Sequence, residues 1–211
     1  MTKQVVVFDL GGVVFNWQPT VLLQQVLPQH ANDEASAHAL GARIFQTFDV
    51  DGDWAQFDLG QIEPGALATR IARRTGLTAQ DVHAVIEAIP PHMTVKADTV
   101  GLMRELRDQG HRLVYLSNMP ATYADWIESD HDFFAWFEDG VFSARVRQMK
   151  PEPAIYQTAV HRLGLAGQAP IFIDDVQRNL DAAHAHGWRG VRFESAGQVR
   201  AQLVEAGLLP V

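Results

Sequence analysis

The sequence predicts an α/β protein in which a doubly wound parallel sheet is interrupted after its first strand by a helical insert. Three observations lead to this prediction. The chain opens on a short apolar run, its second half repeats helix, glycine and apolar strand in that order, and a long stretch with helical patterns separates the two. With 211 residues, of which 47% are hydrophobic, the chain can bury one core that carries such an insert.

The first predicted strand is Val5–Phe8. It has no polar alternation, so we expect a strand buried on both faces, as in a parallel sheet. Asp9 follows at its carboxyl end, where open α/β sheets bind ligands, and Gly11 and Gly12 allow a sharp turn with a close backbone approach. Taken alone, this segment is most simply an ordinary strand-to-loop turn. The alternative is that Asp9 is a nucleophile or a metal ligand. The residues elsewhere in the sequence distinguish these interpretations.

About a hundred residues separate this strand from the next apolar run, far more than one crossover needs. The stretch from about Pro19 to Ile89 shows apolar side chains at helical spacing, and Pro64 marks a helix start. Those side chains are Leu22, Leu23, Val26 and Leu27, then Leu67, Ile71 and Ala72, then Val82, Val85 and Ile86. We therefore predict a helical insert at residues 17–94 that leaves the sheet just after Asp9 and lies over the strand ends as a lid.

The second half of the chain alternates helices and apolar strands. Helices are predicted at Val95–Gln109, Glu152–Leu163 and Asn179–His186, each ending at or beside a glycine. Strands are predicted at His111–Leu116, Pro170–Ile173 and Gly190–Phe193, with a further short strand at Gly140–Ser143. This order is typical of βαβ crossovers in a parallel sheet with helices on both faces.

Composition excludes several classes of function. The net charge is −8, and no basic cluster exceeds two adjacent residues, which argues against nucleic acid or an anionic membrane as the main partner. The chain has no cysteine, so disulfides, thiolate catalysis and cysteine-based zinc sites are excluded. No apolar run is long enough to span a bilayer, and no leader pattern precedes the first strand. We expect a soluble cytoplasmic protein.

Polar residues gather where the apolar strands end. The run RLVYL ends in Ser117 and Asn118, the run IFI ends in Asp174 and Asp175, and a loop between them carries Lys150 in QMKPEP. Carboxylates that converge on one crevice repel each other unless a cation neutralises them, and oxygen ligands without His or Cys favour Mg²⁺.

A metal ion, a hydroxyl, backbone amides and a lysine together suit a phosphoryl group, because they stabilise its charge during transfer. Asp9 is then the candidate nucleophile, which would form an aspartyl-phosphate that water hydrolyses. The alternatives for its partners are structural. In these alternatives, Ser117 and Asn118 cap the next helix, Lys150 is a solvated loop lysine, and Asp174 caps the helix that starts near Val176.

Four motifs carry a family resemblance, and they stand in order along essentially the whole chain: FDLGGV, LSN, KPEPAIY and IDDVQRN. With them the chain resembles the haloacid dehalogenase-like hydrolase superfamily, in the branch with a helical cap after the first strand. Each motif alone is modestly specific, whereas the ordered set is strong. The resemblance implies a Rossmann-like core at residues 1–16 and 95–211 and a cap at residues 17–94. It also implies Mg²⁺-dependent hydrolysis of a small phosphorylated metabolite by a monomer or homodimer.

The resemblance assigns catalytic and phosphate-binding roles. Asp9 takes the nucleophile position, and Ser117 and the backbone amide of Asn118 take the positions that bind the phosphate, together with Gly12. Lys150 takes the position that stabilises the charge on Asp9 and on the phosphate.

The resemblance also assigns the metal ligands. Asp9, the backbone carbonyl of Gly11 and Asp175 take ligand positions, with Asp174 beside them. Asp175 is the stronger candidate of the two neighbouring aspartates. Asn179 stands where the family often has a further acidic residue, and we expect it behind the ligands.

One position departs from the family pattern. Phosphatases of this family usually have a second Asp two residues after the nucleophile, as general acid and then base, and here that residue is Gly11. The DLGxV form resembles sugar-phosphate phosphatases that act on an anomeric phosphate, whose leaving group is more acidic than an ordinary alcohol. Alternatively, a cap residue or water supplies the proton, or the protein is a catalytically silent binding protein.

Two further expectations concern the insert and the reaction. Trp17, Trp54 and Phe57 are candidates for the substrate pocket, although aromatic residues of a helical insert more often form its core. A haloacid dehalogenase without a metal is the alternative enzyme, and the charged pair Asp174 and Asp175 argues against it.

Overall fold

The computed structural model describes residues 3–49 and 51–210. Five parallel strands form one sheet in the order β3-β2-β1-β4-β5, so the first strand lies at its centre. The strands are β1 (Val5–Phe8), β2 (Arg112–Ser117), β3 (Asp139–Phe142), β4 (Ile171–Asp174) and β5 (Arg189–Arg192). The fold is the Rossmann-like α/β arrangement that the sequence predicts.

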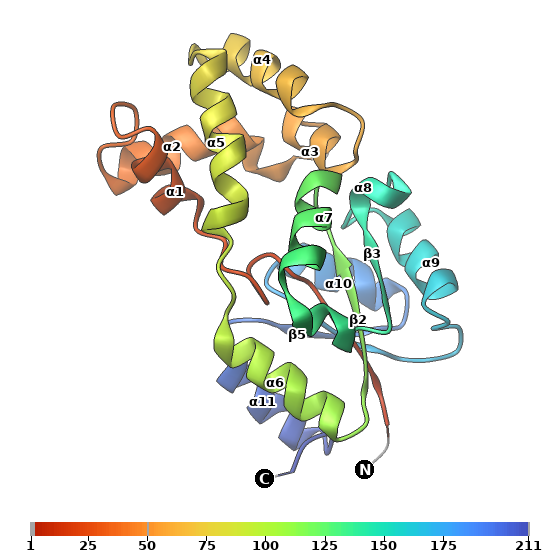
Figure 1. Cartoon of the computed structure of the whole chain (residues 1–211). Coiled ribbons are helices and arrows are strands. Elements are labelled where there is room, and N and C mark those ends of the chain that lie inside the picture. The colour runs from red at the N-terminus through yellow and green to blue at the C-terminus, as the bar shows by residue number, and fades with distance from the viewer. Residues whose placement is uncertain (1–2, 50, 211) are drawn as a thin grey trace.

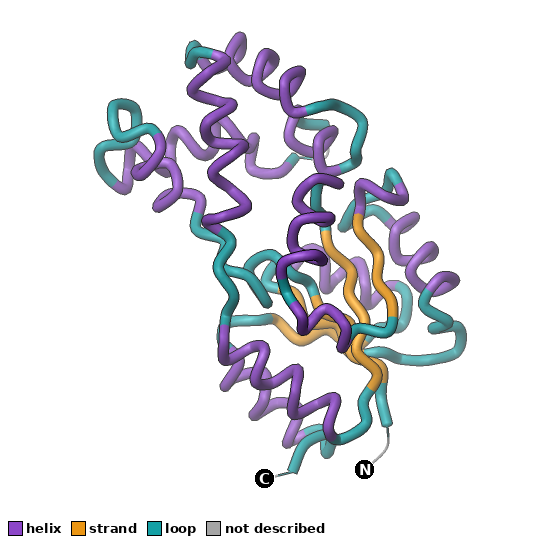
Figure 2. Tube along the Cα trace, viewed as in Figure 1, coloured by secondary structure: helices purple, strands orange, loops and turns teal. Residues whose placement is uncertain are grey.

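Helices cover both faces of this sheet (Figures 1 and 2). The helices of this part are α6 (Ala97–Asp108), α7 (Ala121–Asp130), α8 (Ser143–Val146), α9 (Pro153–Arg162), α10 (Gln177–Ala185) and α11 (Ala196–Glu205), with a 3₁₀ turn, η2, at Asp132–Trp136. Alternate residues of β1 enter two separate cores. Val6 and Phe8 pack with α6, α7 and α11, and Val5 and Val7 pack with α9 and α10. The unbroken apolar run of β1 follows from this double burial.

Within the described residues, five helices and a 3₁₀ turn lie between β1 and α6. They are α1 (Pro19–Val26), α2 (Glu34–Phe45), η1 (Gln46–Phe48), α3 (Asp53–Asp58), α4 (Pro64–Thr75) and α5 (Ala79–His92). Pro64 is the first residue of α4, where its missing N–H costs no hydrogen bond. Asp33 and Thr78 cap α2 and α5 with reciprocal side-chain to backbone bonds. We call residues 17–94 the helical insert; its standing as a separate domain stays a prediction.

The helical insert lies at the end of the sheet to which the carboxyl ends of β2 and β3 point (Figure 1, orange to yellow). Behind α3, Gly60 has a φ of +64°, and a Cβ atom there would lie 3.0 Å from the carbonyl oxygen of Ala144 in the core part. The backbone of the insert therefore rests directly on the segment that follows β3. This contact places the end of α3 over the strand ends.

Several element boundaries differ from the sequence prediction by one or two residues. β2 continues to Ser117 and β4 to Asp174, so both polar residues are the last residues of their strands. The helix predicted from Asn179 begins two residues earlier, at Gln177. No residue range was predicted for the helices α7, α8 and α11. Of these, α11 buries only Val199 and Leu203, so its periodic pattern is weak.

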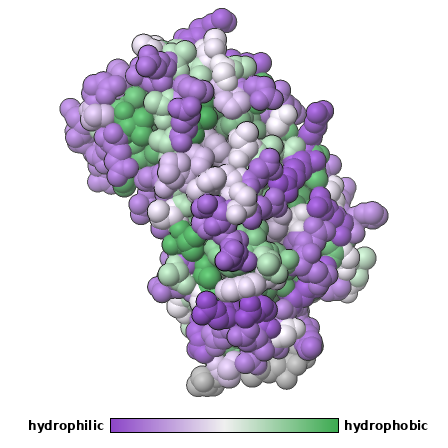
Figure 3. All heavy atoms as spheres, viewed as in Figure 1, coloured by the Kyte–Doolittle hydropathy of each residue, from purple (hydrophilic) through white to green (hydrophobic). Residues whose placement is uncertain are grey.

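The face drawn in Figure 3 is covered mostly by hydrophilic side chains, with small apolar areas between them. Among the described residues, Val21 is the one large apolar side chain in the exposed class. No helix in the described part of the chain is long and apolar enough to cross a membrane.

Candidate active site

Asp9 lies at the carboxyl end of the central strand and is 7% exposed. Its Oδ1 atom accepts hydrogen bonds from the backbone N–H of Leu10, at 2.7 Å, and from the hydroxyl of Ser117, at 2.8 Å. Ser117 reaches it because β1 and β2 are parallel neighbours and both end at this edge of the sheet. The two bonds fix one oxygen of Asp9 and leave the other facing the neighbouring charges.

Lys150 provides the nearest positive charge. Its Nζ atom lies 2.9 Å from Oδ2 of Asp9 and 2.7 Å from Oδ2 of Asp174, and the residue is 2% exposed. A charged lysine can be buried to this extent because two carboxylates pair with it. The interpretation of Lys150 as a solvated loop lysine is therefore wrong.

The side chain of Asn118 holds the backbone of Lys150 in place. Its Nδ2 donates to the carbonyl oxygen of Lys150 at 2.9 Å, and its Oδ1 accepts from the N–H of Lys150 at 2.8 Å. This reciprocal pair ties the end of β2 to the loop before α9. The sequence analysis assigned only the backbone amide of Asn118, so it missed the positioning role of the side chain.

Asp174 is fully buried and its oxygens are occupied. Besides Lys150, it accepts from the N–H of Val176 at 2.8 Å and from Nδ2 of Asn179 at 3.1 Å. The bond from Val176 agrees with the alternative that Asp174 caps the start of α10. The pairing with Lys150 gives Asp174 a second function. Asn179 lies behind Asp174, as expected.

Asp175 faces the open side of the cluster and is partly exposed. Its close approach depends on Gly12, which has a φ of +76°; a Cβ atom there would lie 2.8 Å from Cγ of Asp175. The N–H of Gly12 donates to the carbonyl of Phe15 at 2.9 Å in this structure. Gly12 makes room for Asp175, and its assignment as a phosphate ligand stays a prediction.

Carboxylate oxygens of Asp9, Asp174 and Asp175 all lie within 4.8 Å of one another. Burial, and then the neighbouring carboxylates against the opposing effect of Lys150, raise the pKa of Asp9 to about 7. Burial and Asp174 raise the pKa of Asp175 as well. One lysine does not neutralise three converging carboxylates, and their hard oxygen donors fit a divalent cation such as Mg²⁺. Gly11 lies beside them at the edge of the cavity.

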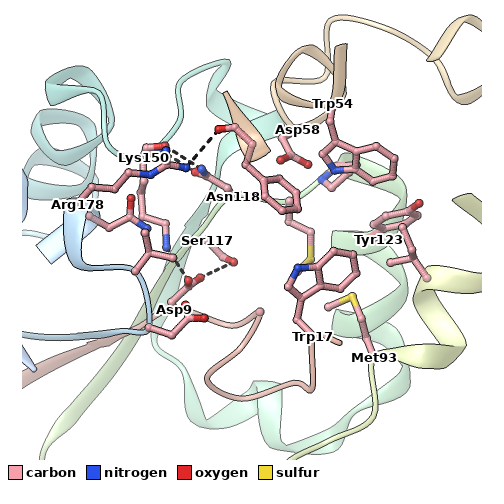
Figure 4. A pocket seen from close by; sticks show the side chains of 18 residues that line it. Asp9, Trp17, Trp54, Asp58, Met93, Ser117, Asn118, Tyr123, Lys150 and Arg178 are labelled. Atoms are coloured by element: carbon pink, nitrogen blue, oxygen red, sulfur yellow. Dashed lines mark hydrogen bonds and ion pairs between the residues drawn. The ribbon is translucent and has the colours of Figure 1, made fainter. Parts of the chain in front are cut away.

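A cavity of about 180 Å³ opens above this cluster (Figure 4). The walls of the cavity away from Asp9, which we call its upper walls, are mainly apolar and come from both parts of the molecule. The helical insert contributes Trp17, Phe48, Trp54, Ile89 and Met93, and the core contributes Met119, Pro120, Tyr123 and Val176. Trp17 and Trp54 therefore line the pocket, as the sequence analysis considered. Phe57 packs between Trp54 and Tyr123 as part of the hydrophobic core.

Three charged residues at or near this cavity were not found from the sequence. Asp58 ends α3 and is 6% exposed, Arg178 lies at the rim, and Lys96 donates to the carbonyl oxygen of Gly12. The guanidinium of Arg178 also donates to the carbonyl of Phe48 at 3.2 Å, which joins α10 to the insert. The sequence gives no sign of them, because a single charged residue in a helix or loop is ordinarily a solvated side chain.

Comparison with known proteins gives a consistent result. Residues 3–187 match the model of a hydrolase family described as haloacid dehalogenase-like hydrolase. The chain is 28% identical over 193 residues to the sesquiterpene phosphatase astK of Aspergillus oryzae, which covers 91% of this chain and 90% of that protein. It is 33% identical over 104 residues to the enolase-phosphatase E1 of Streptomyces avermitilis, which covers 48% of this chain and 43% of that protein.

Among solved structures, the fold is similar to that of the enzyme bt-2542 from Bacteroides thetaiotaomicron, solved in complex with magnesium and inorganic phosphate. The TM-score is 0.71 with 21% identity, and the match covers 93% of this chain and 96% of that chain. At this identity the likeness establishes the fold.

Proposed function

The chain belongs to the haloacid dehalogenase-like hydrolases, and we propose that it is a Mg²⁺-dependent phosphatase of a small phosphorylated metabolite. Its similarity to a phosphatase along most of its length supports the proposal. The observation that carries the proposal is the environment of Asp9. A buried carboxylate is held by Ser117 and Lys150 at the floor of a cavity, within 4.8 Å of two further carboxylates.

In this proposal, the Oδ2 atom of Asp9 attacks the phosphorus and the leaving alcohol departs on the opposite side. Ser117, the amide of Asn118 and Lys150 hold the phosphoryl oxygens, and water then hydrolyses the aspartyl-phosphate. Asp9, the carbonyl of Gly11 and Asp175 would hold the metal ion, with Asp174 fixing Lys150 behind them. A bound Mg²⁺ would offset the charge that develops on the phosphoryl oxygens.

The cavity walls bear on the identity of the alcohol. A sugar needs several polar side chains around its hydroxyls, whereas the upper walls here are formed mainly by aromatic residues, aliphatic residues and methionines. An apolar organic group would instead be buried favourably among them. The similarity to a relative named as a sesquiterpene phosphatase also supports an apolar alcohol. We therefore favour the monophosphate of an apolar alcohol over the sugar phosphate considered from the DLGxV form.

The helical insert acts in this proposal as a lid over the reacting phosphate. Trp17 and Trp54 form part of the pocket from the insert side, and the bond from Arg178 to the carbonyl of Phe48 joins the insert to the core at the rim. Exclusion of water strengthens the charge interactions at the cavity floor. A cytoplasmic location and a monomeric or homodimeric state stay predictions.

Two other functions are separated from this one by a simple assay. A dehalogenase would turn over a 2-haloacid without metal, and a silent binding protein would turn over nothing. A panel of apolar, aromatic and sugar phosphomonoesters, together with a 2-haloacid, is incubated with the enzyme in Mg²⁺, or in excess chelator, with Asp9→Asn as the matched control. We expect phosphate release with Mg²⁺ alone, highest on apolar esters. Turnover that survives chelation, or that Asp9→Asn retains, contradicts the proposal.

A further inference from the structure

We infer that the carboxyl group of Asp58, which the helical insert brings to the cavity, donates the proton that the departing alcohol oxygen needs. The inference rests on the proposed function and adds a catalytic residue to it. Asp58 is the last residue of α3 and lines the same cavity as Asp9 (Figure 4). The leaving oxygen points away from Asp9, and therefore toward the cavity walls to which Asp58 belongs.

The carboxyl group of Asp58 has no hydrogen-bond or ion-pair partner within the described part of the protein, although the residue is only 6% exposed. A buried polar group without a partner is costly, and its retention indicates an external partner. Asp58 lines the cavity, so a molecule bound there can supply that partner. A substrate oxygen there would satisfy the carboxyl group.

The groups on the cavity floor are already engaged. Asp9 is the nucleophile, Lys150 is paired with Asp9 and Asp174, and Asp175 belongs to the metal cluster. Gly11 has no side chain to contribute, and a Cβ atom at that position would have no neighbour within 4 Å. The core side of the cavity therefore offers no free acid.

The remaining polar side chains of the walls do not serve either. The hydroxyl of Tyr123 donates to the carbonyl of Ile86 at 2.7 Å, so its proton is used inside the protein. Arg178 donates to the carbonyl of Phe48, and a guanidinium does not release a proton in proteins. Asp58 is left as the one carboxylic acid of the lining that the phosphate and metal chemistry does not use.

The environment of Asp58 keeps it protonated. Burial raises the pKa of Asp58 to about 8, so the neutral acid predominates at neutral pH. The position at the carboxyl end of α3 acts in the same direction, because the negative end of the helix dipole disfavours a carboxylate. Tyr123 is the titratable group beside it, and the cations Lys150 and Arg178 lie on other walls of the cavity.

A buried serine fixes Asp58 relative to the phosphate site. The hydroxyl of Ser143 donates to the backbone carbonyl of Asp58 at 2.5 Å and accepts from the N–H of Met119 at 2.8 Å. Met119 follows the segment with Ser117 and Asn118, which we propose to bind the phosphate. One hydroxyl thus joins the end of α3 to that segment, as a preorganised acid requires.

The proton balance of the reaction closes with this residue. As the bond from Asp9 to phosphorus forms, the bond to the leaving oxygen breaks and that oxygen keeps the electron pair. It takes the proton of Asp58 and leaves as the neutral alcohol, so Asp58 becomes a carboxylate. Water then attacks the phosphorus, Asp58 accepts its proton, and Asp9 is released with inorganic phosphate.

The test compares two esters of similar size whose leaving groups differ in acidity, 4-nitrophenyl phosphate and 2-phenylethyl phosphate, both in Mg²⁺. Asp58→Asn should lower the rate of alcohol release in the first turnover of the 2-phenylethyl ester by about 10² to 10⁴-fold. It should change that rate on the 4-nitrophenyl ester by less than about tenfold, because a nitrophenolate leaves without a proton. Asp53→Asn, on the same helix but outside the cavity lining, is the matched control and should leave both unchanged.

A second measurement uses the unaltered enzyme and so does not depend on the folding of a variant. The rate of alcohol release in its first turnover should fall on the 2-phenylethyl ester as the pH rises above the pKa of the acid, while that rate on the 4-nitrophenyl ester should lack the fall. Equal losses on both esters in Asp58→Asn, or the same pH profile for both, overturn the inference.

Other outcomes separate this inference from the proposed function. If the unaltered enzyme releases phosphate from no ester, the proposed function fails and Asp58 loses its role with it. If the enzyme is active but Asp58→Asn raises only KM, and does so only for an ester with a cationic alcohol such as phosphocholine, Asp58 binds a cation. In that case the proposed function stands and the inference fails.

Discussion

The hydroxyl oxygen of Ser117 lies 2.8 Å from Oδ1 of Asp9, although 108 residues separate them in the chain. The contact exists because β1 and β2 are adjacent parallel strands whose carboxyl ends meet at one edge of the sheet. The same edge receives Asp174 and Asp175 from β4, on the other side of β1. The central position of β1 therefore creates the site, and the predictions below test its parts.

The first prediction concerns the buried charge of Lys150. Lys150→Met leaves Asp9 and Asp174 without their cation, and we expect the free energy of unfolding to fall by about 3 to 5 kcal/mol. Urea unfolding measures the loss, which Mg²⁺ should partly reverse because it also neutralises the carboxylates. Lys3→Met, which alters an exposed lysine, should have little effect. Equal stability of the two variants would show that the ion pairs of Lys150 with Asp9 and Asp174 contribute nothing to the free energy of unfolding.

The second prediction concerns the metal. Asp175 is the carboxylate of the cluster that faces the cavity, so Asp175→Asn should weaken Mg²⁺ binding at least about tenfold. Because an ion that binds only the folded state raises the melting temperature, thermal unfolding over a series of Mg²⁺ concentrations reports the affinity without an assay of activity. Asp181→Asn, on the exposed side of α10, is the control. An unchanged Mg²⁺ response in Asp175→Asn removes this residue from the proposed ligands.

The third prediction concerns the apolar walls. Trp17→Ala removes part of the pocket, and the lost burial of about 1.5 to 3 kcal/mol corresponds to a fall in kcat/KM of roughly ten- to a hundredfold on esters of long apolar alcohols. Glycerol phosphate, which does not reach this wall, should be affected little. Trp136→Ala, outside the cavity lining, should leave both unchanged. A similar loss on both esters would contradict the apolar subsite.

The sequence was sufficient to predict the sheet and the residues at its strand ends. Asp9, Ser117 and Asp175 follow buried apolar runs, and parallel strands bring such positions together without further information. Lys150 stands in the loop between two such runs, but its role beside Asp9 needed the family motif, because the loop has no periodic pattern. Gly12 was assigned by its place in the motif, and the hydrogen bond from its N–H to the carbonyl of Phe15 leaves no pattern in the sequence.

The contribution of the helical insert could not be predicted in the same way. Asp58 stands in WAQFDLG, where an acid before a helix end is ordinarily a solvated residue. Its burial depends on how α3 packs against the segment with Ser143 and Ala144, far along the chain. Arg178 and Lys96 likewise become significant only through contacts with Phe48 and Gly12. Such contacts leave no local pattern in the sequence.

The fourth prediction concerns pH and stability. The pKa of Asp58 is raised from 3.8 to about 8 by burial, with Tyr123 as its titratable neighbour, so between these values the folded protein holds a proton that the unfolded chain has lost. The contribution of Asp58 to stability is therefore fully present below about pH 4 and is lost as the pH rises toward 8.

The corresponding measurement compares urea unfolding of the protein and of Asp58→Asn at several pH values. Asn does not titrate, so the stability of the protein relative to this variant should fall between pH 5 and pH 8, by up to about 4 kcal/mol. A constant difference across this range would show that Asp58 is ionised in the folded state.

The central claim is that Asp9 accepts the phosphoryl group, and the most direct test is to detect that group on it. Enzyme in excess is mixed with an apolar phosphomonoester and Mg²⁺, quenched in acid within one turnover, and digested for peptide mass spectrometry. We expect the mass of one phosphoryl group on the peptide that contains Asp9, absent in Asp9→Asn and absent when Mg²⁺ is chelated. Phosphate release without any labelled enzyme, or a label on another residue, would contradict the account.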